Sequence, residues 1–338
     1  MLMQIAELEE FKGAWEGFAR LRPEQLKALK KVSTIESIGS SNRIEGNKLS
    51  DAEVETLLSR IDKKSFSSRD EEEVAGYAEL MNIVFDDYSV IPLSENYIKQ
   101  LHKILLQYTG KDERHRGEYK KLANTVSAYD PNGNEIGIVF ETATPFDTPR
   151  LMEELVEWTR KNLDDPLLHP LIVIGVFIVH FLAIHPFQDG NGRLSRALTA
   201  MLLLKKGYDY VPYSSLESII EASKEGYYRA LRRTQKDIRG DGVDYEPWLS
   251  FFLTSLQKQK RHLESRIGNM AGDDIKLSRN QKAILKLFND KPELSSSEIA
   301  GQLDMNIETT KKNVKWLTDN GYLIKHGTTK GAWYQRKQ

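Results

Sequence analysis

The chain of 338 residues contains no cysteine. This absence excludes disulfide frameworks, thiolate nucleophiles and zinc sites with cysteine ligands. It also fits a reducing compartment, and we therefore expect a cytoplasmic protein.

The chain also lacks a charge excess of either sign. Its 48 lysines and arginines nearly balance 49 aspartates and glutamates, which leaves a formal net charge of -1. The whole molecule therefore has no bulk attraction to nucleic acid or to an anionic membrane, and any such affinity must be local. With 40% hydrophobic and 29% charged residues, the composition indicates an ordinary soluble globular protein of more than one domain.

No hydrophobic run is long enough for a membrane span. The most apolar stretch, residues 170–184, contains a histidine and is shorter than the roughly 20 residues that a spanning helix needs. The first fifteen residues carry acidic side chains where a secretory signal would have an apolar core. We expect no membrane partner, and residues 170–184 are predicted to form a buried central helix.

Helical periodicity dominates the rest of the chain. Apolar residues recur at helical spacing in many segments, and the predicted helices cover residues 26–38, 51–61, 73–85, 94–108, 149–163, 170–184, 194–206, 226–239 and 246–267. The fold class is therefore predicted as mainly α.

One segment, residues 126–149, interrupts this pattern. It carries Asn132-Gly133 between residues of strand character, which is a strong signal for a β-hairpin. Pro145 and Pro149 argue against a continued helix. We expect a small hairpin that projects from the helical body, and an ordinary surface loop is the alternative interpretation.

A compact unit is predicted after a small, polar stretch at residues 268–274, which is typical of a linker. Three short helices and a strand-turn-strand follow, and this order resembles a winged helix-turn-helix. The recognition helix would be residues 307–318 and the wing residues 322–334. Ser295–Ser297 with Glu298 form an N-cap cluster for the second helix, and Gly321 suits the end of the third.

Basic residues outnumber acidic ones in residues 276–338, twelve to six. A local excess of this kind is what contact with DNA phosphates requires. The alternative is that the unit binds protein or only packs, with its lysines solvated.

The segment His185 to Arg196, "HPFQDGNGRLSR", concentrates reactive side chains at a turn between two predicted helices. Its glycine-rich loop, Asp189 to Gly192, lies at a helix N-terminus, where free N–H groups and the helix dipole favour an anion such as phosphate. Arg193 and Arg196 are three residues apart and can reach outward to phosphate oxygens.

Two further side chains complete this chemistry. Asp189 can hold a Mg²⁺ ion that bridges phosphate oxygens, and His185, largely neutral at pH 7, can take a proton from a hydroxyl. The combination suits nucleotidyl transfer to a hydroxyl group. The spacing is not that of a P-loop.

At these residues the sequence resembles the Fic (Fido) family, whose pattern is His-Pro-Phe-x-x-Gly-Asn-Gly-Arg-x-x-Arg with an acidic residue before the first glycine. The resemblance implies a helical core that transfers AMP from ATP to a Ser, Thr or Tyr hydroxyl of a target protein, with ATP as co-substrate and Mg²⁺ as cofactor. It assigns His185 as general base, Asp189 as metal ligand, and as nucleotide-binding residues Phe187, Gly190, Asn191, Gly192, Arg193 and Arg196.

The resemblance extends to two other segments. The hairpin would be the flap on which Fic proteins align a target by strand addition, with the docking edge at Ile138, Val139, Phe140, Glu141 and Thr142. Residues 225–231 resemble the adenine-side helix of the family, with Tyr227 and Tyr228 as nucleotide-binding candidates. These tyrosines could equally be core aromatics.

A third segment fits the inhibitory pattern of the family. In residues 41–46, "SNRIEG", Ser41 and Glu45 would share one face of a helix and Gly46 would follow them. In proteins that resemble this one, the glutamate pairs with the second arginine of the motif, here Arg196, and blocks seating of the γ-phosphate. A solvated helix glutamate is the alternative.

These features predict an N-terminal helical region with the inhibitory motif (1–90), a Fic core (91–268) and a winged-helix domain (269–338). We expect an autoinhibited AMP transferase. Removal of AMP from modified proteins, or a DNA-binding regulator whose Fic-like body senses the nucleotide, are the alternatives. The sequence leaves open self-modification, a homodimer of the helical body and DNA as a partner of the winged helix.

Overall fold

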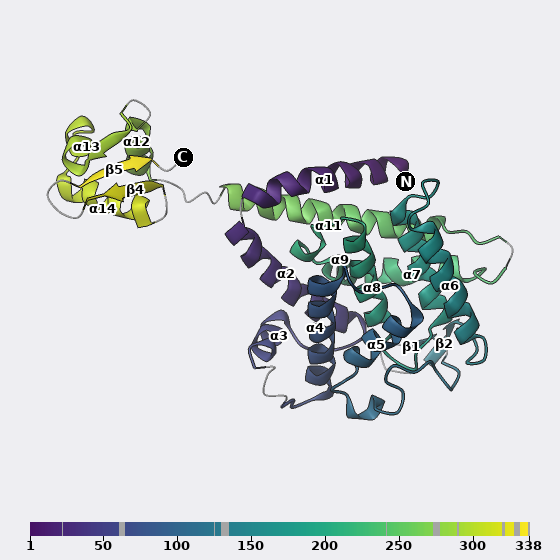
Figure 1. Cartoon of the computed structure of the whole chain (residues 1–338). Coiled ribbons are helices and arrows are strands. Elements are labelled where there is room, and N and C mark those ends of the chain that lie inside the picture. The colour runs from purple at the N-terminus through teal and green to yellow at the C-terminus, as the bar shows by residue number, and fades with distance from the viewer. Residues whose placement is uncertain are drawn as a thin grey trace. The chain divides into compact units, whose positions relative to one another are not determined.

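The computed structural model describes residues 1–21, 23–60, 65–124, 126–129, 135–240, 242–272, 278–288, 291–319, 322–327 and 332–336. The predicted hairpin turn at Asn132-Gly133 and the predicted helix end at Gly321 lie outside these residues. The chain divides into two compact units, Met1–Ser265 and Arg266–Gln338 (Figure 1). The predicted inhibitory region, 1–90, belongs to the same unit as residues 91–265.

The first unit is built almost entirely of helices. They are α1 (Leu2–Leu21), α2 (Pro23–Ile44), α3 (Asp51–Leu58), α4 (Arg69–Asp87), α5 (Glu95–Leu105), α6 (Thr148–Asn162), α7 (Pro170–Ile184), α8 (Asn191–Lys205), α9 (Leu216–Ala222), α10 (Lys224–Gln235) and α11 (Glu246–Gly272), whose residues from Arg266 on belong to the second unit. The short 3-10 helices η2 (Gly110–Asp112) and η3 (Val211–Tyr213) lie between them.

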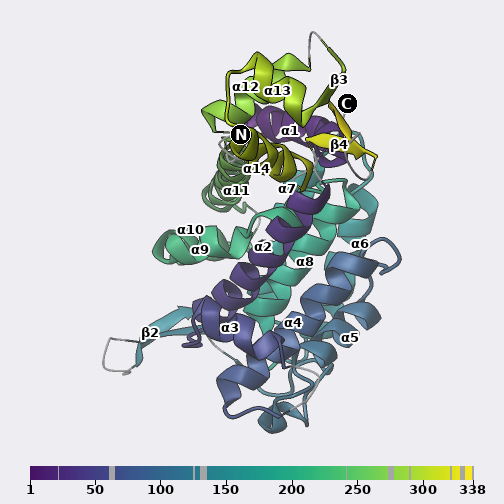
Figure 2. The same cartoon turned by 90° about the vertical axis from the view of Figure 1, so that its left-hand side faces the viewer.

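Helices α7 and α8, which pack against each other and are largely buried, form the centre of this unit. Helix α7 starts at Pro170, which suits a first helical position, and the His169 side chain accepts a hydrogen bond from the Leu171 N–H. Its side chains are apolar on nearly every face, as expected of a helix that other helices surround. Helices α2 and α4 both pack against α8 (Figure 2).

Three helices differ from the sequence prediction. Helix α1 was not predicted, although Ile5, Leu8 and Phe11 have helical spacing; it lies along α11 (Figure 1), where the Gln4 side chain donates hydrogen bonds to Thr254 and Gln257. Helix α9 was also missed. Helix α11 continues to Gly272, so residues 268–272 are helical and the prediction of a linker there is wrong.

The predicted hairpin is present. Strand β1 (Val126–Tyr129) pairs antiparallel with β2 (Glu135–Phe140), and Figure 2 shows it extending away from the helices. The predicted fold class is confirmed: a mainly helical chain with a small hairpin and a C-terminal winged-helix unit.

The second unit holds α12 (Arg279–Leu287), β3 (Glu293–Ser295), α13 (Ser296–Gln302), α14 (Ile307–Asp319), β4 (Leu323–His326) and β5 (Trp333–Arg336). Ser295 caps α13 in a reciprocal pair with Glu298, as the N-cap cluster predicts. The predicted strand-turn-strand gains a third member, because β3 pairs with β5 in a sheet of order β3-β5-β4.

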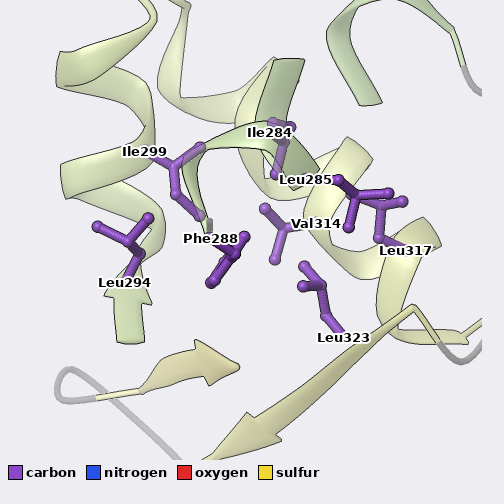
Figure 3. Close-up of a cluster of buried hydrophobic side chains, with 8 residues drawn as sticks. All are labelled: Ile284, Leu285, Phe288, Leu294, Ile299, Val314, Leu317 and Leu323. Carbon is purple, nitrogen blue, oxygen red and sulfur yellow. The ribbon is translucent and has the colours of Figure 1, made fainter. Parts of the chain in front are cut away.

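A compact apolar cluster holds this unit together (Figure 3). Its members are Ile284, Leu285, Phe288, Leu294, Ile299, Val314, Leu317 and Leu323. The turn between α13 and α14 contains Asp304 at φ 48°, a left-handed conformation that aspartate tolerates better than most residues.

Among the described residues, no helix combines the length and the apolar character needed to cross a membrane.

The two units should unfold separately. Leu317 is fully buried in the cluster of the second unit, so Leu317→Ala should cost about 2–5 kcal/mol of its stability. Calorimetry should show two unfolding transitions, of which the one that belongs to the second unit moves to a lower temperature while the other keeps its temperature. Lys315→Ala, on the exposed face of the same helix, is the matched control, and a shift of both transitions by Leu317→Ala would contradict separate units.

Candidate active site

His185 lies at the turn between α7 and α8. It ends α7 in the left-handed conformation (φ 52°, ψ 61°), which a helix end usually gives to glycine. A non-glycine residue in this region is strained and must be held by its surroundings. Its Nδ1 lies 3.3 Å from the Leu182 carbonyl oxygen, and since a carbonyl only accepts, Nδ1 carries the proton and Nε2 keeps a free lone pair.

The protonation of His185 follows from its environment. Burial and the nearby Lys120 cation lower the pKa of His185 to about 4, although Glu45 and Asp189 oppose the shift. The imidazole is therefore neutral at physiological pH and able to accept a proton.

Lys120 and Asn124 hold the backbone around His185. Lys120 Nζ donates to the Ile184 carbonyl at 2.9 Å, where a cation also suits the negative end of the α7 dipole. The Asn124 amide donates to the Phe187 carbonyl at 2.7 Å. Burial and Arg239 lower the pKa of Lys120 to about 8. These contacts supply the restraint that a strained histidine requires.

The glycine loop continues into α8. Gly190 has φ 78° and stands at the N-cap of α8, a conformation for which glycine is suited. The Asn191 side chain bonds both backbone groups of Phe187, its Oδ1 accepting from N–H at 2.9 Å and its amide donating to C=O at 2.7 Å. Asn191 thus closes the loop, and its side chain faces inward.

His102, which sequence reasoning missed, contacts the glycine loop through Phe187 and Asp189. Its ring stacks on the fully buried Phe187 ring at 3.8 Å. Nδ1 accepts the Gly117 N–H, so Nε2 donates to the Asp189 carbonyl at 2.9 Å. Both ring nitrogens are therefore engaged in orienting the loop.

Arg193 and Arg196 are buried, with side-chain exposures of 3% and 4%. The expectation that both reach outward is wrong, because each is drawn to anionic partners within the protein. Arg193 Nη1 lies 3.3 Å from Glu73 Oε2, while its Nε makes no hydrogen bond to any described residue. That buried donor remains available to an oxygen ligand.

Asp189 belongs to a closed ring of charges. Its Oδ2 accepts a hydrogen bond from Arg69 Nη2 at 3.0 Å. Arg69 Nε in turn donates to Glu73 at 2.7 Å, and Glu73 also forms an ion pair with Arg193. Arg193 Nη2 lies 3.6 Å from Asp189 Oδ1. Neither Arg69 nor Glu73 was singled out from the sequence.

The donor set at Asp189 fits a divalent cation only in part. Within the described residues, no three histidine, aspartate or glutamate side chains gather to hold a metal ion. A single carboxylate, 40% exposed, matches the way Mg²⁺ is held by one or two carboxylates together with substrate phosphates. Asp189 would therefore hold the ion only with a bound nucleotide.

Glu45 lies over the glycine loop from the end of α2. Its Oε1 accepts from Arg196 Nη2 at 2.8 Å, and a Cβ atom placed on Gly192 would lie 2.1 Å from the same oxygen. The carboxylate therefore rests directly against the loop backbone. Burial lowers the pKa of Arg196, but Glu45, Tyr227 and Tyr77 together outweigh it and the net shift is upward.

Ser41 takes part in the same contact. Its hydroxyl and its carbonyl oxygen each accept a hydrogen bond of 2.8 Å from Arg196. Helix α2 ends at Ile44, so Glu45 sits in the following turn rather than on the helix as predicted. Gly46 then turns the chain at φ 98°.

Arg43 fixes this turn to the body of the unit. Its guanidinium bonds Glu221 on α9 at 2.8 and 3.0 Å, Asp51 on α3 at 2.9 Å and the Leu49 carbonyl at 3.0 Å. The position of Glu45 thus depends on the hydrogen bonds that Arg43, two residues earlier in the chain, makes with α3 and α9.

The two tyrosine candidates differ. Tyr227 is buried and packs among Tyr228, Trp248 and Phe251, which agrees with a core aromatic. Burial raises the pKa of Tyr227 to about 12. Tyr228 is only half-buried, and Glu45 contributes to a raised pKa at both rings.

The flap candidates separate into strand and base. Ile138, Val139 and Phe140 belong to β2. Glu141 is exposed beyond the strand, whereas Thr142 is buried and its hydroxyl accepts a hydrogen bond from the Lys120 ammonium at 2.9 Å. The Thr142 side chain is thus part of the support of the His185 turn.

The residues that sequence reasoning missed share a type of position. His102, Lys120, Asn124, Arg69 and Glu73 come from α4, α5 and the segment before the hairpin. Each acts through a contact distant in sequence, and no local pattern marks it.

Comparisons with known proteins place this geometry in a family. Residues 92–203 match the Fic/DOC family and residues 277–324 match the winged helix-turn-helix DNA-binding family. The chain is 32% identical over 109 residues to a probable protein adenylyltransferase of Aquifex aeolicus (32% of this chain, 33% of that protein). It is 27% identical over 239 residues to protein adenylyltransferase Fic of Drosophila willistoni (69% of this chain, 42% of that protein).

The chain therefore spans about a third to two fifths of the length of these curated relatives. Among solved structures, a Fic family protein from Desulfovibrio desulfuricans G20 is similar in fold, with a TM-score of 0.60 and 22% identity over 99% of this chain and 96% of that one. The chain thus contains a Fic/DOC-family domain followed by a winged helix-turn-helix domain.

Proposed function

We propose that this protein transfers AMP from ATP to a hydroxyl side chain of a target protein and that Glu45 holds it inactive. The observation that carries the proposal is the Glu45 carboxylate, which pairs with Arg196 at 2.8 Å and lies against Gly192 at the start of α8. A carboxylate there occupies the place that favours a phosphate. The relatives named as adenylyltransferases support the same reaction.

His185 would act as the general base. Its neutral imidazole, oriented through Nδ1, leaves Nε2 to take the hydroxyl proton of the target. The hydroxyl oxygen then forms a bond to the α-phosphorus of ATP, and the bond to the bridging oxygen breaks. Pyrophosphate leaves, and the proton remains on His185.

The start of α8 would bind the phosphates. The N–H groups at the N-terminus of α8 and the helix dipole favour the anion. Arg193 Nε is a buried donor with no hydrogen-bond partner among the described residues, and Arg196 would exchange its Glu45 partner for a phosphate oxygen. Asp189 would hold Mg²⁺ together with the phosphates, which supplies charge neutralisation on the transferred group.

The hairpin would present the target. The described part of the chain pairs β2 with β1 alone, so an extended target segment can add to the other edge of β2 through backbone hydrogen bonds. Thr142, at the base of β2, contacts Lys120 and so the His185 turn. The docked hydroxyl would thus be brought toward the base.

Glu45→Gly should raise AMP transfer. Charge-assisted contacts of this kind are worth roughly 1–2 kcal/mol after allowance for the 35% exposure of Glu45. We therefore expect a rate about fivefold to thirtyfold higher, measured as label from α-phosphate-labelled ATP on the protein itself and on lysate proteins.

Glu45→Gln, which keeps the shape without the charge, should lie between the two. Glu45→Gly/His185→Ala should bind ATP and transfer no label. Equal transfer by wild type and Glu45→Gly at saturating ATP would contradict autoinhibition, and release of AMP from a modified protein by wild type would favour the reverse reaction.

The pH profile should show the low pKa of His185. The base is active while neutral, so activity is present above its pKa and is lost as pH falls through about 4. For Glu45→Gly we expect kcat/KM at pH 5.5 to stay near its value at pH 7.5, whereas a histidine of ordinary pKa would lose about tenfold. Removal of Glu45 lowers the pKa further, so the variant does not weaken the test. A tenfold fall by pH 5.5 would assign an ordinary pKa to the base.

The second unit favours an additional function, binding of DNA. Its match to a winged helix-turn-helix DNA-binding family carries this proposal. On α14, Thr310, Val314 and Leu317 are buried, while Lys312 and Lys315 are exposed. The polar face of α14 would enter the major groove, and the lysines would contact phosphates.

Lys312→Ala and Lys315→Ala should each weaken binding to mixed-sequence duplex DNA. Each should also reduce the slope of log K against log salt by about 1, because one phosphate contact is lost. Lys286→Ala, exposed on α12, serves as control in a fluorescence anisotropy titration. Binding that is independent of salt, or equal in all variants, would argue for a protein partner of this unit.

A further inference from the structure

Arg69, the first residue of α4, forms an ion pair with Asp189. The position of Arg69 at the start of its helix is not one that favours a cation. The helix dipole disfavours a cation at an N-terminus, and the other residues of the first turn that bear charge are Asp70, Glu71 and Glu72. Arg69 instead reaches across to Asp189 Oδ2 at 3.0 Å, 120 residues later in the sequence.

The contact is held in place from behind. Arg69 Nε donates to Glu73 Oε1 at 2.7 Å, one turn along α4. Glu73, with its side chain 14% exposed, uses its other oxygen for Arg193. Asp112 Oδ2 lies 3.8 Å from Arg69 Nη2 and adds a second anion on the same side. The Arg69 guanidinium is therefore aimed at Asp189 rather than free in solvent.

The same Asp189 oxygen is the natural ligand for a divalent cation. Oδ1 already accepts the Gly190 N–H at 2.6 Å, so Oδ2 is the oxygen left for a cation, and Arg69 occupies it. A guanidinium and a metal ion cannot both take that oxygen closely, since their charges repel and their positions overlap.

We propose that Arg69 competes with the divalent cation for Asp189, so that it sets the cation concentration at which the nucleotide complex forms. Because Asp189 receives the cation only under the proposed function, the competition rests on that function. Release of Asp189 by Arg69 accompanies metal binding, and Glu73 and Asp112 keep the released guanidinium paired. Arg69 is a positioning residue and takes no part in the transfer itself.

The test measures metal binding rather than activity. In the Glu45→Gly background, free Mn²⁺ is followed by electron paramagnetic resonance during titration in the presence and absence of ATP. With ATP, Arg69→Ala should lower the half-saturating Mn²⁺ concentration by about threefold to fivefold, the value of a partly exposed ion pair. Arg69→Lys, which keeps the positive charge of the side chain, should give a half-saturating Mn²⁺ concentration between those of the parent and Arg69→Ala. Asp189→Asn should abolish the ATP-dependent binding of Mn²⁺.

Arg60→Ala is the matched control. Arg60 pairs with Glu71 of α4 at 2.7 Å, and the side-chain exposures of that pair, 45% and 14%, equal those of Arg69 and Glu73. Among the described residues, the ion pair of Arg60 is with Glu71 and not with Asp189, so its removal should leave the Mn²⁺ dependence unchanged. Unfolding temperatures of all variants, measured alongside, exclude a loss of fold.

An unchanged Mn²⁺ dependence in Arg69→Ala would overturn the competition while leaving the proposed function intact. If this variant also binds ATP more weakly in EDTA, Arg69 is a phosphate ligand instead. Absence of ATP binding by the Glu45→Gly parent would instead overturn the proposed function, and the competition with it.

Discussion

Two buried guanidiniums on one turn of α8 are the constraint on which the rest of the site depends. Arg193 and Arg196 are both almost fully buried, and a buried charge without a partner is costly. Glu45, Ser41, Glu73 and Asp189 supply the anionic and polar contacts. Under the proposed function, a phosphate would therefore replace Glu45 at Arg196, and the contact that stabilises the buried guanidinium would be the same one that blocks the ligand.

Much of this arrangement could be predicted from the sequence. The helices followed from apolar spacing, the hairpin from Asn132-Gly133, and the capping of α13 from Ser295 and Glu298. The loop at the start of α8 could be recognised because its residues are adjacent in the chain and their spacing is fixed by their chemistry. Local signals suffice where the structure that they describe is local.

The remainder depends on contacts between distant segments. Nothing near Arg69 in the sequence indicates Asp189, and nothing near His102 indicates that its ring stacks on Phe187. The outward direction expected for the two arginines was wrong because their partners come from the turn after α2 and from α4. Such pairings are set by how helices pack, which a single sequence does not contain.

The burial of α8 has a consequence for how proteins of this design can diversify. Every residue of α8 except Gly192 and Lys205 is buried, so most substitutions there would disturb packing as well as the ligand site. Under the proposed function, a change of target preference would then arise more readily outside α8 than within it. The helix that binds the phosphates would stay constant while substitutions elsewhere in the unit alter which protein is modified.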